Sequence, residues 1–216
     1  MNRCSNRYQC LPYVDVEIGP ETKVVLDEIL NTFTIPAVLI RSSASSYKSG
    51  LFQLIDIIQL HDTAALLVDD VELCRGLHAD GVHLSPGSQI QARYSQARQF
   101  LGKHFIIGAS TGESRHDAMV LGELGADYIG FCQSECVNDL KSKSKLLDLI
   151  AWWAELFELP CVALGAWSEL ETLELVQSGA DFISIPISRK LSAAEAVHKI
   201  RVVKKLICKH SFEVIL

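Results

Sequence analysis

Apolar residues in this chain gather in eight short runs, most of them continuous rather than alternating with polar residues. Continuous runs of this length are typical of strands buried on both faces of a sheet. The predicted strands are Leu11–Asp15, Ala37–Arg41, Ala64–Val68, Gly81–Leu84, Phe105–Ala109, Tyr128–Phe131, Cys161–Leu164 and Phe182–Ile185. Strands of this kind belong to parallel sheets, whose connections run through helices.

The segments between these runs carry helical patterns. The clearest helix is Lys145–Leu159, where apolar residues recur along one stripe. Ser168 begins the next helix, and Glu171 completes a capping box three residues later. Ala193–Ile207 is predicted as the final helix. Strands that alternate with helices in this order indicate a parallel sheet.

Three short segments, called here the repeated phrases, share one sequence pattern: His78–Val82, Gly125–Ile129 and Gly179–Ile183. Each follows a helical stretch, turns at Ala-Asp and opens a strand. Gly125 and Gly179 stand where a helix needs a left-handed last residue. Each interval between the phrases has room for two helix–strand units, the rhythm of a (β/α)₈ TIM barrel. A doubly wound open sheet is the rival, and the even rhythm of eight strands favours closure.

The 216 residues are short for such a barrel but sufficient, and 49% hydrophobic with 21% charged residues fits one well-filled core. We predict a single α/β barrel domain over 11–216. Residues 1–10 are predicted to be a disordered segment. It is polar and lacks the apolar stretch of a secretory signal.

A net charge of −6 argues against nucleic-acid binding, and no apolar run reaches the roughly 20 residues of a membrane span. The seven cysteines include no C-x-x-C pair, so a reducing cytoplasm is the simplest interpretation. Cys161 is expected to be a small buried hydrophobe. Cys132 and Cys136 are weak candidates for a metal clamp.

Chemistry in a TIM barrel sits where the strands end. Arg41 suits phosphate through its bidentate fork, or forms a salt bridge, with Asp69 as one partner. Asp69 is a candidate ligand for Mg²⁺, and a helix cap or ion pair is the equal alternative. Asp70 should point elsewhere and cap the following helix. His83 lies within a strand, where a histidine with its hydrogen bonds satisfied in the core is the commoner case.

Small residues at later strand ends are candidates for binding phosphate. The loop Ser110–Gly112 offers backbone N–H groups near the start of a helix. Its alternative role is a helix cap by Thr111 or Ser114. Barrel phosphate sites are usually built after strands seven and eight. The predicted phosphate-binding set is therefore Ser110, Thr111, Gly165, Ala166, Ser184 and Ser188.

Several stretches together resemble one known family. They are Leu66–Leu84, Ile106–Thr111, Gly125–Phe131, Pro160–Gly165 and Gly179–Asp181. The family is thiamine phosphate synthase, or thiamine-phosphate pyrophosphorylase, whose fold a thiazole tautomerase shares. The resemblance covers nearly the whole chain and implies a TIM barrel. It also implies an Mg²⁺-dependent transferase that joins hydroxymethylpyrimidine diphosphate to thiazole phosphate and releases pyrophosphate.

The resemblance carries over to single residues. Asp69 matches the family's first metal-binding aspartate, and Arg41 matches the arginine of its Gln-x-Arg-x-Lys motif. Ser110 matches the serine of its Gly-Val-Ser loop, and Gly165 the first glycine of Gly-Gly-Ile. The resemblance thus implies catalytic roles for Arg41, Asp69 and Ser110, with Asp69 as the metal ligand.

The chain departs from the family pattern elsewhere. Leu39 and Ser43 replace the glutamine and lysine of the second strand, and Ser88 stands near the second metal aspartate. Gln133–Lys141 replaces a Thr-x-Thr-Lys loop, and Ala166–Trp167 replaces Gly-Ile. Each lost charge-assisted contact is worth on the order of 1.5–3 kcal/mol. Weakened synthase activity is the expectation.

Three functions therefore stand side by side. The first is a thiamine phosphate synthase with weakened or altered activity. The second is a non-catalytic paralogue that binds phosphate or thiazole phosphate. The third is a tautomerase-like isomerase, for which His83 and His116 are the nearby candidate bases. A small phosphorylated ligand is common to all three. Weakly held Mg²⁺ belongs to the first, and a homo-oligomer is left open.

Overall fold

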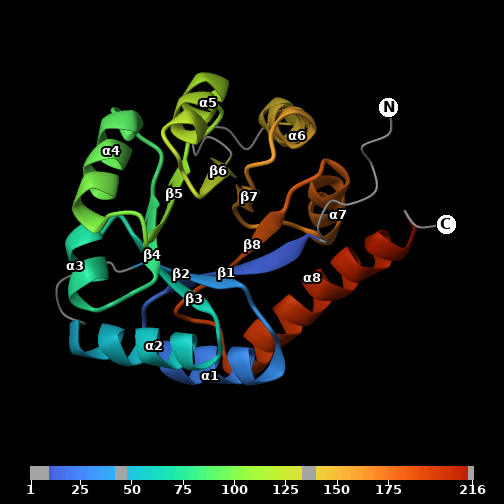
Figure 1. The fold of residues 1–216 in the computed structure, drawn as a ribbon. Coiled ribbons are helices and arrows are strands. Elements are labelled where there is room, and N and C mark those ends of the chain that lie inside the picture. The colour runs from blue at the N-terminus through green and yellow to red at the C-terminus, as the bar shows by residue number, and fades with distance from the viewer. Residues whose placement is uncertain (1–9, 42–47, 133–139, 214–216) are drawn as a thin grey trace.

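Eight strands form at the apolar runs, and a helix follows each of them (Figure 1). The computed structural model describes residues 10–41, 48–132 and 140–213. The strands are β1 (Leu11–Glu17), β2 (Ala37–Arg41), β3 (Ala64–Val68), β4 (Gly81–Leu84), β5 (Ile106–Ser110), β6 (Tyr128–Cys132), β7 (Cys161–Leu164) and β8 (Phe182–Ile187). The helices are α1 (Thr22–Thr32), α2 (Lys48–Leu60), α3 (Val71–Gly76), α4 (Ile90–Leu101), α5 (Arg115–Glu123), α6 (Leu140–Leu156), α7 (Glu169–Gln177) and α8 (Ala193–Glu213).

The strands close into a barrel in chain order, and all neighbours are parallel. The first and last strands complete it, with Tyr13 opposite Ser184 and Val16 opposite Ile187. The predicted (β/α)₈ barrel is confirmed, and the open-sheet alternative is wrong. Figure 1 shows the helices as a ring around the strands.

Element ends differ from prediction where tertiary pairing decides them. Strands β1 and β8 each run two residues further, because Val16 pairs with Ile187, Glu17 pairs with Arg41 of β2, and Pro186 pairs with Asp15. β5 includes Ser110, which was predicted to lie in the following loop. Helix α6 ends at Leu156, just ahead of Pro160, rather than at Leu159.

Side chains that alternate along the strands divide the apolar residues into two clusters. The larger cluster lies between the barrel wall and the helices. The smaller fills the barrel interior; its buried members are Tyr13, Ala37, Leu39, Leu66, Tyr128, Val162 and Leu164. Tyr128 has room there only because residue 108 is glycine. A Cβ added to Gly108 would lie 2.0 Å from Cζ of the Tyr128 ring.

The three repeated phrases lie at the other end of the barrel from the strand carboxyl ends. Each aspartate accepts a hydrogen bond from a backbone N–H at the start of the preceding strand. Asp80 accepts from Ala65 at 2.7 Å, and Asp127 from Ile107 at 2.7 Å. Asp181 accepts in the same way from Cys161, at 2.8 Å. These aspartates tie neighbouring strands together, so their role is structural.

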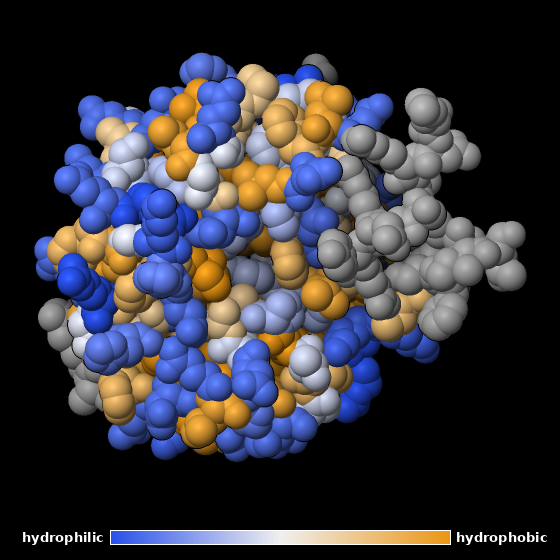
Figure 2. Space-filling model, in the orientation of Figure 1, coloured by the Kyte–Doolittle hydropathy of each residue, from blue (hydrophilic) through white to orange (hydrophobic). Residues whose placement is uncertain are grey.

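Smaller predictions have mixed outcomes. The capping box of Ser168 and Glu171 is confirmed, and Cys161 is fully buried as expected. Cys136 and residues 1–9 lie outside the described part of the chain, whereas Cys10 is buried. None of the described helices has the length and apolar character needed to cross a bilayer. On the face shown in Figure 2, hydrophobic residues are scattered among hydrophilic ones.

Candidate functional site

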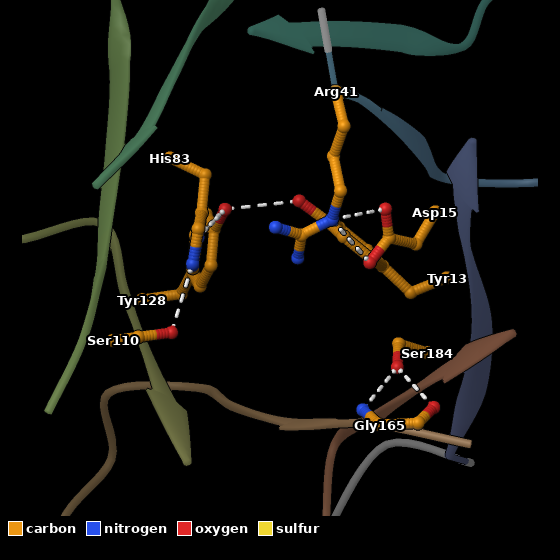
Figure 3. A network of polar contacts seen from close by, with 8 residues as sticks. All are labelled: Tyr13, Asp15, Arg41, His83, Ser110, Tyr128, Gly165 and Ser184. Carbon is orange, nitrogen blue, oxygen red and sulfur yellow. Dashed lines mark hydrogen bonds and ion pairs between the residues drawn. The ribbon is translucent and has the colours of Figure 1, made fainter. Parts of the chain in front are cut away.

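Four buried polar side chains form an unbroken line inside the barrel (Figure 3). The hydroxyl groups of Tyr13 and Tyr128 are 2.9 Å apart, and the Tyr128 hydroxyl is 2.8 Å from Nδ1 of His83. Nε2 of His83 is 2.9 Å from Oγ of Ser110. The four residues come from β1, β6, β4 and β5, so barrel closure alone brings them together. Ser110, at the end of β5, is the member nearest the strand carboxyl ends.

The line is uncharged at neutral pH. Burial, with a contribution from the charge of Arg41, lowers the pKa of His83 from 6.5 to about 3. Burial also raises the pKa of both tyrosines, Tyr13 and Tyr128, above the usual value of 10. A neutral imidazole whose two nitrogens are both engaged is the core histidine considered for His83. As a base it is weak, because it holds a proton only in strong acid.

Arg41 pairs with Asp15, not with Asp69, the partner considered from the sequence. Its Nε lies 2.8 and 3.0 Å from the two carboxylate oxygens of Asp15. In Figure 3 the two terminal nitrogens of Arg41 point away from Asp15. Burial raises the pKa of Asp15, and the bond and charge of Arg41 oppose that rise. Asp15 therefore orients the half-exposed guanidinium through Nε, and the terminal N–H groups lie outside this ion pair.

Asp69 forms an ion pair with Arg93 of α4. The same oxygen of Asp69 accepts the backbone N–H of Ser85 at 2.8 Å, and Arg93 also donates to the Ser85 carbonyl at 2.9 Å. Of the two alternatives for Asp69, the structure shows the ion pair. Asp70 caps α3 by accepting from the N–H of Leu73, which confirms that prediction.

These donors do not fit a resident Mg²⁺ site. Mg²⁺ sites use one or two carboxylates plus substrate phosphates. Here the one matched carboxylate, Asp69, already neutralises a guanidinium, and Ser88 offers no second carboxylate. Within the described residues no three His, Cys, Asp or Glu side chains form a group able to hold a metal. Asp69 alone therefore does not make a resident site, and Mg²⁺ binding by Asp69 together with a substrate diphosphate stays a prediction.

The predicted phosphate-binding residues are only partly brought together. Oγ of Ser184 accepts the N–H of Gly165 at 2.8 Å and donates to its carbonyl at 3.0 Å. The indole of Trp167 covers Gly165, since a Cβ at that residue would lie 2.8 Å from the ring. Ala166 and Ser188 are exposed, and Ser188 lines a separate small pocket beside α1. A phosphate cradle at Gly165 would require its N–H to leave Ser184.

In the loop after β5, some polar groups form hydrogen bonds within the protein and one does not. The backbone N–H of Thr111 donates to the carbonyl of Gly130 at 3.0 Å. Its hydroxyl is buried and has no hydrogen-bond partner in the described chain. Ser114, not Thr111, caps α5. This loop therefore has one buried hydroxyl without a partner within the described residues, while its first backbone donor is occupied.

Sequence reasoning missed the ion-pair partners of Arg41 and Asp69, which are Asp15 and Arg93. Asp15 stood at the predicted end of its strand, which was a usable signal because strand ends carry the chemistry of barrels. Arg93 gave no signal, since it lies inside the helical segment Ile90–Leu101. Ser43 and most of the replaced loop, 133–139, lie outside the described residues. Lys143 beyond that loop forms an ion pair with Glu174 at 2.9 Å.

The fold and site together define a TIM-barrel protein with polar groups gathered at the carboxyl ends of its strands. The sequence profile of the family described as thiamine monophosphate synthase matches residues 20–187. The chain belongs to this family. A thiamine-phosphate synthase of Caldicellulosiruptor bescii is 32% identical over 163 residues, which cover 73% of this chain and 70% of the relative.

Other comparisons add a second sequence relative and a solved structure with the same fold. A thiamine-phosphate synthase of Erythrobacter litoralis is 37% identical over 132 residues, 60% of this chain. That match spans only 61% of the relative's length, and the match to a Rhodospirillum centenum relative also spans 61%. The solved thiamine phosphate pyrophosphorylase of Pyrococcus furiosus shares the fold, with a TM-score of 0.70, 21% identity, and coverage of 92% of this chain and 97% of that one.

Proposed function

We propose that this chain is a slow transferase of the thiamine-phosphate synthase type. In that reaction the bond between the pyrimidine methylene carbon and the diphosphate oxygen breaks, and pyrophosphate leaves with the electron pair. The thiazole nitrogen then bonds to the methylene carbon. Family membership and the matches at Arg41, Asp69, Ser110 and Gly165 support this reaction. Catalysis of this kind depends on positioning and on neutralising charge.

The proposal that the reaction is slow rests on the balance of charge at the strand ends. Arg41 is paired with Asp15, and Arg93 with Asp69. These four side chains have no net charge. A departing diphosphate needs surplus positive charge around it. The terminal N–H groups of Arg41 are then the main cationic donors that these side chains offer to a phosphate.

A non-catalytic paralogue that binds thiazole phosphate is the second candidate, and the same paired cations favour it. One oriented guanidinium suffices for a monophosphate, while a diphosphate needs more. The tautomerase alternative finds less support, because His83 is a weak base and His116 is an exposed residue of helix α5 that takes no part in the line. We propose that the ligand is a small phosphorylated molecule and that the protein acts in the cytoplasm, without a nucleic-acid or membrane partner.

A coupled assay for thiamine phosphate tests the proposal, with purified protein, both substrates and Mg²⁺. We expect product at a rate below the roughly 1–10³ s⁻¹ usual for enzymes. Arg41→Ala should abolish it, whereas Arg75→Ala, which removes an arginine at the Phe100 carbonyl, should leave it unchanged. Turnover within that usual range by the wild-type protein, if Asp69→Ala abolishes it, would refute the proposal that the enzyme is slow.

Thermal unfolding with thiazole phosphate separates the two candidates. Ligand that binds the native state raises the melting temperature. Stabilisation without detectable product would establish the binding paralogue in place of the transferase. Neither stabilisation at millimolar ligand nor product would refute both candidates.

A further inference from the structure

The line Tyr13–Tyr128–His83–Ser110 has one hydrogen more than its internal bonds use. Each of the three hydroxyl groups carries one hydrogen, and a neutral imidazole carries one N–H. Three contacts link the four groups, so each contact takes one hydrogen and one remains. Because a neutral imidazole donates from one nitrogen and accepts at the other, His83 couples the directions of its contacts with Tyr128 and Ser110.

If Tyr128 accepted from both neighbours, its own hydrogen would be left buried in mid-line with no acceptor within the described residues, so the spare hydrogen belongs at one of the two ends. At the Tyr13 end it would lie inside the barrel, near the ion pair of Asp15 and Arg41 (Figure 3). No second hydrogen bond of the Tyr13 hydroxyl occurs within the described residues. A donor left there would cost about 1–3 kcal/mol with nothing to offset it.

At the Ser110 end the spare hydrogen lies where barrels bind ligands. Ser110 is fully buried, and the described residues give its hydroxyl no partner besides His83. The next residue, Thr111, is 7% exposed and carries a buried hydroxyl without a partner in the described chain. A buried hydroxyl without a partner, next to a hydroxyl whose one contact is His83, indicates that this strand end has room for an acceptor atom.

We propose that the line is polarised from Tyr13 towards Ser110, so that each group donates to the next and Ser110 keeps its hydrogen for an anionic phosphate oxygen. Tyr13 then donates to Tyr128, and Tyr128 donates to Nδ1 of His83. His83 is the Nε2–H tautomer and donates to Ser110. His83 and Tyr128 are positioning residues, because they act on the ligand through Ser110.

Only the choice of phosphate as the ligand rests on the proposed function. The direction of the line is a property of the ligand-free protein. Failure of the synthase proposal therefore leaves the polarity to be judged by its own measurement.

Nitrogen NMR of ¹⁵N-histidine-labelled protein at pH 7 measures that polarity directly. We expect His83 to carry its proton on Nε2 and none on Nδ1. Tyr128→Phe should abolish this preference, since it removes the donor to Nδ1. Tyr13→Phe removes the same group from the end of the line and should keep the tautomer. A proton on Nδ1 in the wild-type protein overturns the proposal.

Titration with inorganic phosphate tests the role of Ser110. A hydrogen bond to a charged group is worth enough that Ser110→Ala should weaken binding roughly tenfold or more. Thr63→Val is the matched control. It removes a buried hydroxyl that donates to the Ile35 carbonyl at 2.9 Å, at the opposite end of the barrel. Equal affinity in Ser110→Ala and wild type, or no measurable binding by wild type, overturns the donor role.

Discussion

Protonation of His83 should destabilise this protein well above the pH at which the folded protein takes up the proton. Burial and the charge of Arg41 lower its pKa from 6.5 to about 3, while Asp69 acts in the opposite direction. The unfolded chain exposes the imidazole and binds its proton near pH 6.5. Between pH 6.5 and 3 the unfolded state therefore binds more protons, so stability falls as the pH is lowered.

The size of the effect follows from this shift. One pKa unit corresponds to about 1.4 kcal/mol, so the full shift is worth about 5 kcal/mol below pH 3. Between pH 7.5 and 5.5 the unfolded imidazole goes from mostly neutral to mostly protonated, which contributes about 1.4 kcal/mol. A folded pKa of 4 in place of 3 would leave this second figure almost unchanged.

Urea unfolding at pH 7.5 and 5.5 measures the effect, with His83→Gln as the comparison. The free energy of unfolding of the wild type should fall by about 1.4 kcal/mol more than that of the variant. Other histidines are common to both proteins and cancel in the difference. Equal losses in both proteins would refute the reasoning. If His83→Gln does not fold, an NMR titration decides, and His83 should stay neutral down to pH 5.

Four further predictions concern the backbone and the metal. His78→Gly should stabilise the protein by about 0.5–1 kcal/mol, because His78 has a φ of 57°. Gly125→Ala, at the matching position with a φ of 88° and open space at Cβ, should destabilise it by about 1–2 kcal/mol; urea unfolding that shows no such contrast would contradict both. Gly108→Ala should cost roughly 3 kcal/mol or more, since its Cβ would overlap the Tyr128 ring, and an unchanged melting temperature would contradict this. Millimolar Mg²⁺ alone should not raise the melting temperature, and a rise that Asp69→Asn removes would show a metal site after all.

The sequence by itself determined the elements and their order. Continuous apolar runs, the capping box at Ser168 and the cap at Asp70 depend on residues close together in the chain, so local patterns predict them. The repeated phrases gave the rhythm of eight units, because His78, Gly125 and Gly179 all have a positive φ at a helix end. That rhythm was enough to predict a closed barrel.

Only the tertiary structure decided which polar groups meet. Asp15 reaches Arg41, and Tyr13 reaches Tyr128, across strands whose register no local pattern encodes. Arg93 lies within a helix, and its bond to Asp69 depends on how α4 packs beside β4 and β5. Residues far apart in the chain become neighbours when the barrel closes, and their pairing removes the surplus charge that single residues had suggested. The strand ends could be predicted from the sequence, but their balance of charge required the fold.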